Sequence, residues 1–179
     1  MPRFNPERIR KMVSSMRLAV RQLFELSQLD EKDFLNDVHK IASAKYNFII
    51  GIEAAIDIGN HIISQNGFRA PEDYADTFSV LGEYEVVDKE FVKELRKMAR
   101  FRNRLVHIYW EVDDKQIYQI MQSNLKDFKI FLNHVSSFLH LESTDLSRLI
   151  TIEPWANLRA SQEVSGERRP EKLEQEKRF

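Results

Sequence analysis

The chain has 179 residues, of which 42% are hydrophobic and 31% are charged. This composition excludes a disordered protein and predicts one globular domain. The formal net charge of −1 provides no overall positive field, so a polyanion such as RNA would have to be held by a local patch, for which Arg100, Arg102 and Arg104 are candidates. The absence of cysteine excludes disulfides, thiolate zinc sites and a cysteine nucleophile, and is consistent with a reducing compartment.

The ends and the most apolar stretch of the chain predict no contact with a membrane. The N-terminal residues lack the apolar core of a signal peptide. The apolar stretch 46–63 is interrupted by Asn47, Glu53, Asp57 and Asn60, which a membrane-spanning helix would not tolerate. A cytoplasmic location is expected.

The first half of the chain predicts two helices. Asn5-Pro6-Glu7 is a helix start, and apolar residues then recur at three- and four-residue spacing to about Ser27. Asp30 is the expected cap of a second helix, whose apolar period continues to Gln65 and stops at Asn66-Gly67. This would be a single helix of about nine or ten turns, the central post of a bundle.

The second half predicts a short helix over 74–81 and two longer helices. Asp88 is the expected cap of the first long one, in which Val106 belongs to the apolar stripe and Phe101 lies off it. Asp113 and Gln116 resemble a capping box for the last helix, which runs to about His140.

The predicted fold is an all-α, up-and-down four-helix bundle with an additional short helix and a C-terminal extension. The expected boundaries are 1–141 for the bundle and 142–179 for a partly flexible extension. Within the extension, Ile150 to Trp155 could form a short extended piece, and ten of the seventeen residues 163–179 are charged.

The stretch 100–110 gathers most of the side chains that could act on a phosphate. Arg102 offers a planar fork of donors that suits phosphate oxygens, and His107 is the side-chain type that titrates near neutrality. Asn103 and Arg104 lie between these two, and Tyr109 adds a hydroxyl. The alternative interpretation is an arginine-rich helix end that is simply solvated, with cations near the negative end of the helix dipole.

Helical geometry makes Arg102 and His107 an awkward pair. They are five residues apart, so a continuous helix points them about 140° from each other. Either the helix ends near Val106 and turns His107 back, or a second copy of the chain completes the site.

A polar stripe crosses the apolar central helix. Glu53, Asp57, Asn60 and His61 fall on one helical face. They could form a pocket wall or a metal site, although a metal needs at least three converging ligands. The alternatives are an internal polar network or a face that meets another subunit.

The polar stripe at 53–61, followed along the chain by the motif at 102–109, resembles the two signatures of the HepT-like toxins of the HEPN ribonuclease superfamily. The segment 102–109 is similar to the family's arginine, four residues, histidine, one residue, tyrosine motif, and 53–61 is similar to its central-helix signature. The resemblance covers roughly residues 8–140. It implies a metal-independent endoribonuclease without a cofactor, working as a homodimer whose two motifs meet in one groove.

The resemblance also implies roles for the residues. Arg102 and His107 would be catalytic, and Asn103 and Arg104 would support them. The implied partner is a small nucleotidyltransferase antitoxin that adenylylates Tyr109. The competing hypothesis is a non-catalytic partner subunit of a nucleotidyltransferase that binds a nucleotide and uses its arginines only as a phosphate clamp, and a plain structural bundle is the third.

Overall fold

The computed structural model describes residues 1–141, and within this range the regular structure is entirely helical. In chain order the elements are α1 (Pro6–Ser27), α2 (Glu31–Leu35), α3 (Val38–Asn66), α4 (Tyr74–Glu83), α5 (Lys89–His107), the 3₁₀ turn η1 (Tyr109–Glu111) and α6 (Asp114–Phe138). The prediction of an all-α fold is confirmed. The extended piece expected at 150–155 lies outside the described residues, and the boundary expected at 141 stays a prediction.

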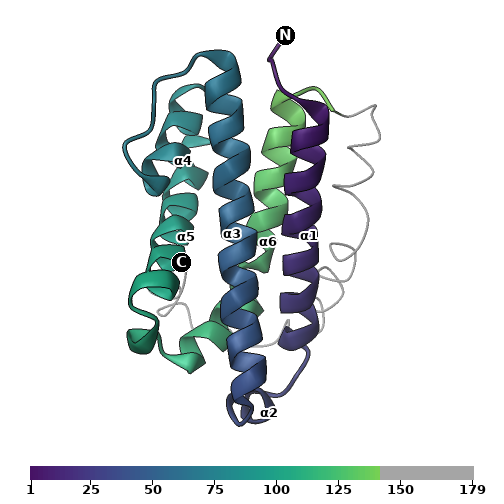
Figure 1. Cartoon of the computed structure of the whole chain (residues 1–179), viewed down its shortest axis with the longest axis vertical. Coiled ribbons are helices and arrows are strands. Elements are labelled where there is room, and N and C mark those ends of the chain that lie inside the picture. Colours follow the sequence, from purple (N-terminus) through teal and green to yellow (C-terminus); the bar gives the residue numbers. More distant parts are fainter. Residues whose placement is uncertain (142–179) are drawn as a thin grey trace.

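The long helices form an up-and-down bundle around α3 (Figure 1). Helices α1, α3, α5 and α6 alternate in direction along the chain, and α3 packs against all three of the others as well as against α4. The short helix α4 lies beside α5 on the side of α3 away from α1. No helix among residues 1–141 is long and apolar enough to cross a membrane.

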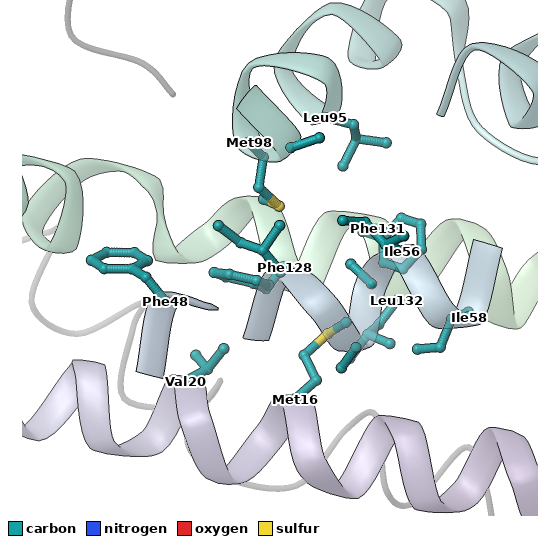
Figure 2. Packing of buried hydrophobic residues seen from close by; sticks show 14 of the residues in the cluster. Met16, Val20, Phe48, Ile56, Ile58, Leu95, Met98, Phe128, Phe131 and Leu132 are labelled. Carbon is teal, nitrogen blue, oxygen red and sulfur yellow. The ribbon is translucent and has the colours of Figure 1, made fainter. Parts of the chain in front are cut away.

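The core follows from the apolar stripes of these helices (Figure 2). Met16 of α1, Met98 of α5 and Phe128 of α6 converge on the middle of α3, and all three side chains are fully buried. Because α3 has neighbours on several sides, its middle section is apolar almost all round, as expected of a buried central helix. The polar residues in that section therefore need specific partners.

The prediction of a single long helix from Asp30 to Gln65 is wrong, because the helix is interrupted at Asn36 and Asp37. The break separates the short α2 from α3. The Asp37 carboxylate accepts hydrogen bonds from the backbone N–H groups of His39 (3.0 Å) and Lys40 (3.2 Å), which caps α3. An aspartate that satisfies the free N–H groups of a new helix start competes with continuation of the helix before it.

Two apolar residues of α5 are placed opposite to expectation. Phe101 is buried and meets Phe48 edge-on, with ring centroids 5.4 Å apart, whereas the Val106 side chain is exposed. Val92 packs against Gly82 at the end of α4, and Arg102 packs against Tyr74 at its start. Val106 lies one turn beyond the part of α5 that α4 covers, which explains its exposure.

The predicted helix ends are largely confirmed. The Asn5 side chain accepts from the Arg8 N–H at 3.0 Å, and Asp113 accepts from the Lys115 N–H at 3.0 Å. Gly67 has φ +68°, a left-handed conformation that glycine adopts without steric cost. The side chain of Gln116 accepts a hydrogen bond from Arg104 at 3.4 Å, so it links α6 to α5.

Candidate active site at the end of α5

Helix α5 carries the arginine–histidine motif on its last two turns. The helix continues through His107 and ends there, because Ile108 (φ −136°, ψ 40°) leaves the helical region. The helix thus ends near Val106, as one alternative expected, but His107 is itself helical and is not turned back. Arg102 and His107 lie on one continuous helix and point in different directions, as the helical period requires.

Arg102 is anchored by a carboxylate from the central helix. Its Nε donates to Glu53 Oε2 at 2.5 Å and its Nη2 donates to Glu53 Oε1 at 2.8 Å, which is the two-point geometry of a strong arginine–carboxylate pair. Its Nη1 donates to Asn103 Oδ1 at 3.2 Å. The Arg102 side chain is only 11% exposed. Partial burial and these three bonds hold the guanidinium in one orientation.

A tyrosine from α4 covers the same guanidinium. The Cζ atom of Arg102 lies 4.9 Å from the centroid of the Tyr74 ring, within the range of a cation–π interaction. Arginine has five N–H donors and the bonds to Glu53 and Asn103 use three. Within residues 1–141, two donors are thus left for an anion such as a phosphate.

Tyr74 is placed by the first turn of α4. Asp73 caps this helix by accepting from the Asp76 N–H at 2.7 Å. Arg69 forms ion pairs with Asp76 (2.7 Å) and Glu83 (2.6 Å), so the loop after α3 is tied to α4 at two points. The hydrogen bonds from Arg69 lower the pKa of Asp76 to about 2. The Asp73 cap and the Arg69–Asp76 pair fix the start of α4, and with it the ring over Arg102.

The other end of the motif is open. His107 is exposed, and within residues 1–141 its imidazole has no hydrogen bond or ion pair. Tyr109 is 60% exposed and its ring meets Trp110 edge-on, with centroids 5.2 Å apart. An exposed imidazole and an exposed phenol two residues apart are both accessible to a large ligand.

The structure separates the three arginines that the sequence groups together. Arg102 points to α3, whereas Arg104 is half-buried and donates to Gln116 of α6 at 3.4 Å. Arg100 is exposed. Only one of the three is therefore a freely accessible surface cation, and Arg104 connects α5 to the next helix.

Three side chains of the polar stripe on α3 contact three different partners. Glu53 holds Arg102, Asn60 accepts a hydrogen bond from Thr77 of α4 at 3.1 Å, and the buried His61 accepts from the backbone N–H of Asn5 at 2.9 Å. Three of the four side chains thus have internal partners whereas Asp57 is exposed, so the internal polar network and the face that meets another subunit both stay predictions. No group of three potential metal ligands occurs among the described residues.

Two groups of the stripe have shifted pKa values. Burial lowers the pKa of His61, and the positive charge of Arg8 lowers it further. Desolvation raises the pKa of Asp57, the negative charge of Glu53 adds to this rise, and Arg8 opposes it. His61 is thus held in the neutral form that can accept the N–H of Asn5.

The sequence did not reveal the two residues that orient Arg102. Glu53 was predicted only as one member of a polar stripe, and Tyr74 was predicted only as a helix start. Their pairing with Arg102 joins α3, α4 and α5, which are far apart along the chain. The one available signal was the pair of carboxylates, Glu53 and Asp57, in the apolar middle of α3, since a charge in apolar surroundings needs a partner.

Comparison with known proteins identifies the family of this chain. Residues 16–135, which include the motif and the stripe, match the profile described as "Ribonuclease HepT-like". The chain belongs to the HepT-like ribonuclease family. This HepT-like chain is 28% identical over 118 residues to the tRNA nuclease HepT of Aphanizomenon flos-aquae. The aligned region covers 65% of this chain and 78% of that protein.

Two further relatives come from Shewanella oneidensis. The mRNA nuclease HepT is 32% identical over 85 residues, covering 48% of this chain and 64% of that protein. The solved structure of a tri-AMPylated HEPN toxin in complex with its MNT antitoxin superimposes with a TM-score of 0.69 at 25% identity, covering 74% of this chain and 99% of that one. The bundle of this HepT-like chain thus has the fold of that toxin.

Proposed function

We propose that this HepT-like chain is an endoribonuclease that acts as the toxin of a toxin–antitoxin system. The observation that carries the proposal is the motif geometry, in which an arginine is held in one orientation and an exposed histidine follows five residues later. Relatives described as tRNA and mRNA nucleases support the same activity.

The chemistry needs no metal. The 2′-hydroxyl of the substrate attacks the adjacent phosphorus while His107 takes its proton, and the bond to the 5′-oxygen breaks as a second His107 or a water protonates that oxygen. The remaining N–H donors of Arg102 stabilise the negative charge that develops on the phosphate oxygens. The products end in a 2′,3′-cyclic phosphate and a 5′-hydroxyl, and DNA is not cleaved because it lacks the 2′-hydroxyl.

The active site is composite, made by two copies of the chain. Arg102 and His107 of one chain point apart, so one subunit cannot place both on the same phosphate. A two-fold dimer brings the His107 of each copy toward the Arg102 of the other. Asn103 acts in this arrangement by holding Nη1 of Arg102, and Glu53 orients the same guanidinium.

The antitoxin is a nucleotidyltransferase that adenylylates Tyr109. This hydroxyl is accessible and lies two residues after His107. Transfer of AMP adds bulk and a negative charge beside the imidazole, which blocks the RNA sterically and repels its phosphates. The AMPylated toxin of Shewanella oneidensis in complex with its antitoxin supports this proposal.

The test is cleavage of labelled total RNA in EDTA by the wild type, His107→Ala and His39→Ala. His39 is another exposed histidine, at the start of α3, and serves as the matched control. The wild type and His39→Ala should cleave and leave cyclic-phosphate ends, whereas His107→Ala should not. Cleavage by His107→Ala at the wild-type rate would remove His107 from the mechanism.

The Glu53–Arg102 pair favours one alternative function. A carboxylate that accepts from both Nε and Nη2, on one edge of the guanidinium, compensates its charge, which suits an arginine that anchors structure in a non-catalytic partner subunit. Absence of cleavage by wild-type protein whose mass shows no AMP on Tyr109 would support this alternative, together with tight binding of a nucleotide.

A further inference from the structure

The outward face of α5 carries a row of cations that leads to His107. Lys89, Lys93, Arg96 and Arg100 are all exposed, and we call them the basic ridge. We propose that the basic ridge binds the phosphates of a single-stranded RNA and guides the strand to His107. This proposal rests on the proposed function for the identity of the polyanion, and it adds a binding surface that the catalytic motif does not contain.

Helical spacing aligns the basic ridge with His107. Successive members are separated by four, three and four residues, and His107 follows Arg100 after seven. At 100° per residue these side chains fall within about 60° of one another, on the side of α5 opposite the buried Met98. The four cations place about one positive charge on each helical turn over roughly 17 Å of axis, and His107 lies about 10 Å further along.

Little negative charge opposes the basic ridge on its own helix. Of the acids on α5, Glu94 is paired with Lys97 at 3.2 Å, which leaves Glu90 at the flank of the row. Arg96 is near enough to Asp76 of α4 to help lower the pKa of that carboxyl. A local positive strip thus exists on a chain whose formal net charge is −1.

The chemistry of the basic ridge favours a polyanion over a protein partner. Stable protein interfaces need an apolar or aromatic centre. Among the described residues, none of the large exposed hydrophobic side chains lies between Lys89 and Arg100. A row of cations without such a centre suits a phosphate backbone, whose binding depends on charge and therefore on salt.

Arg102 does not contribute to this row. Its side chain points to the opposite side of α5, where Glu53 and Tyr74 enclose it. The basic ridge therefore approaches the site from the His107 side, and the strand meets the imidazole before it reaches an Arg102. Binding by the basic ridge and orientation by Glu53 can thus be disturbed separately.

The experiment measures the Kd of a labelled single-stranded 2′-O-methyl oligoribonucleotide, which cannot be cleaved, over a series of salt concentrations. The variant is Lys89→Gln/Lys93→Gln, and the control is Arg10→Gln/Lys11→Gln, which removes two exposed cations from α1 on the far side of α3. Each lost phosphate contact should reduce the slope of log K against log salt by about 0.7, so the ridge variant should lose about 1.4 and the control nothing.

Cleavage of a dinucleotide and of a long RNA by the same proteins separates binding from chemistry. The ridge variant should cleave the dinucleotide at the wild-type rate and show a raised KM for the long RNA. A wild-type salt slope in the ridge variant, or an equal loss in the control, would overturn the proposal. So would wild-type RNA binding together with loss of the complex with a co-expressed nucleotidyltransferase, which would make the surface a protein-docking site.

The outcome for the proposed function is independent. If the wild-type chain binds the oligonucleotide through the basic ridge and cleaves no RNA, the ridge assignment stands and the ribonuclease assignment fails. If the wild type cleaves RNA and the ridge variant binds the oligonucleotide normally, the ribonuclease assignment stands and the ridge assignment fails.

Discussion

Arg102 and His107, the two ends of one motif, lie on opposite sides of α5 in opposite environments. On the inner side, Arg102 is nearly buried, bonded twice to Glu53 and covered by Tyr74. On the outer side, His107 is exposed, and within residues 1–141 it has no polar partner. One catalytic candidate is therefore oriented by the fold of a single chain, whereas the other is left for a substrate or a second subunit to engage.

This difference separates stability from activity. A buried, hydrogen-bonded charge contributes to folding, and its loss leaves an unpaired partner behind. An exposed histidine contributes little to folding, and its loss affects only the reaction. Substitutions on the two sides of α5 should therefore be distinguishable by measuring the free energy of unfolding and the cleavage rate together.

The largest expected effect comes from the exposed side. His107→Ala should lower the single-turnover cleavage rate by about 10²–10⁴-fold, because a general base contributes that much. Its free energy of unfolding in urea should stay within about 0.5 kcal/mol of the wild type. Arg102→Ala, by contrast, should lower both quantities. A strongly destabilised His107→Ala protein would show that the imidazole is part of the fold.

The next effect tests the partner of Arg102. Glu53→Gln should destabilise the chain by about 1–3 kcal/mol, because it removes a charged acceptor from a partly buried guanidinium. Asp57→Asn is the matched control, one turn further along α3 at an exposed carboxyl whose pKa is already raised. Asp57→Asn should leave stability unchanged or slightly higher. Equal unfolding midpoints for the two variants would argue against an anchoring role of Glu53.

A smaller effect is expected from the ring over Arg102. Tyr74→Leu should cost about 0.5–1 kcal/mol of stability, the range of a cation–π interaction at a partly exposed site. Tyr46→Leu removes another exposed tyrosine, on α3, and should have no such cost. Thermal unfolding of both variants checks this, and a double cycle of Tyr74→Leu with Arg102→Lys should show that the two effects are coupled.

The smallest effect concerns pH and the far end of the α3 stripe. Burial lowers the folded-state pKa of His61 below the ordinary histidine value of 6.5, so the unfolded chain binds a proton more readily. His61 thus contributes stability above about pH 6.5, and this contribution is lost as the pH falls through 6.5 toward the folded pKa. Urea midpoints measured downward from pH 7.5 should show the loss in wild type. The loss should be absent in His61→Gln, and an unchanged slope in that variant would exclude His61 as its source.

Much of the fold was predictable from local patterns in the sequence. Apolar residues at three- and four-residue spacing located the long helices, and caps such as Asn5, Gly67 and Asp113 marked their ends. These signals are local, because a helix closes its hydrogen bonds within four residues. The break at Asp37 was missed since the apolar period continues across it.

The sequence by itself determined the helical bundle and the residues of the motif, but it left open whether the chain turns His107 back toward Arg102. Only the tertiary structure decided which side chains are held and which are open. Glu53 and Tyr74 reach Arg102 across 49 and 28 positions of sequence, and Val106 is exposed although it belongs to the predicted apolar stripe. Such contacts depend on how helices pack, and the packing of distant helices leaves no local periodicity to read.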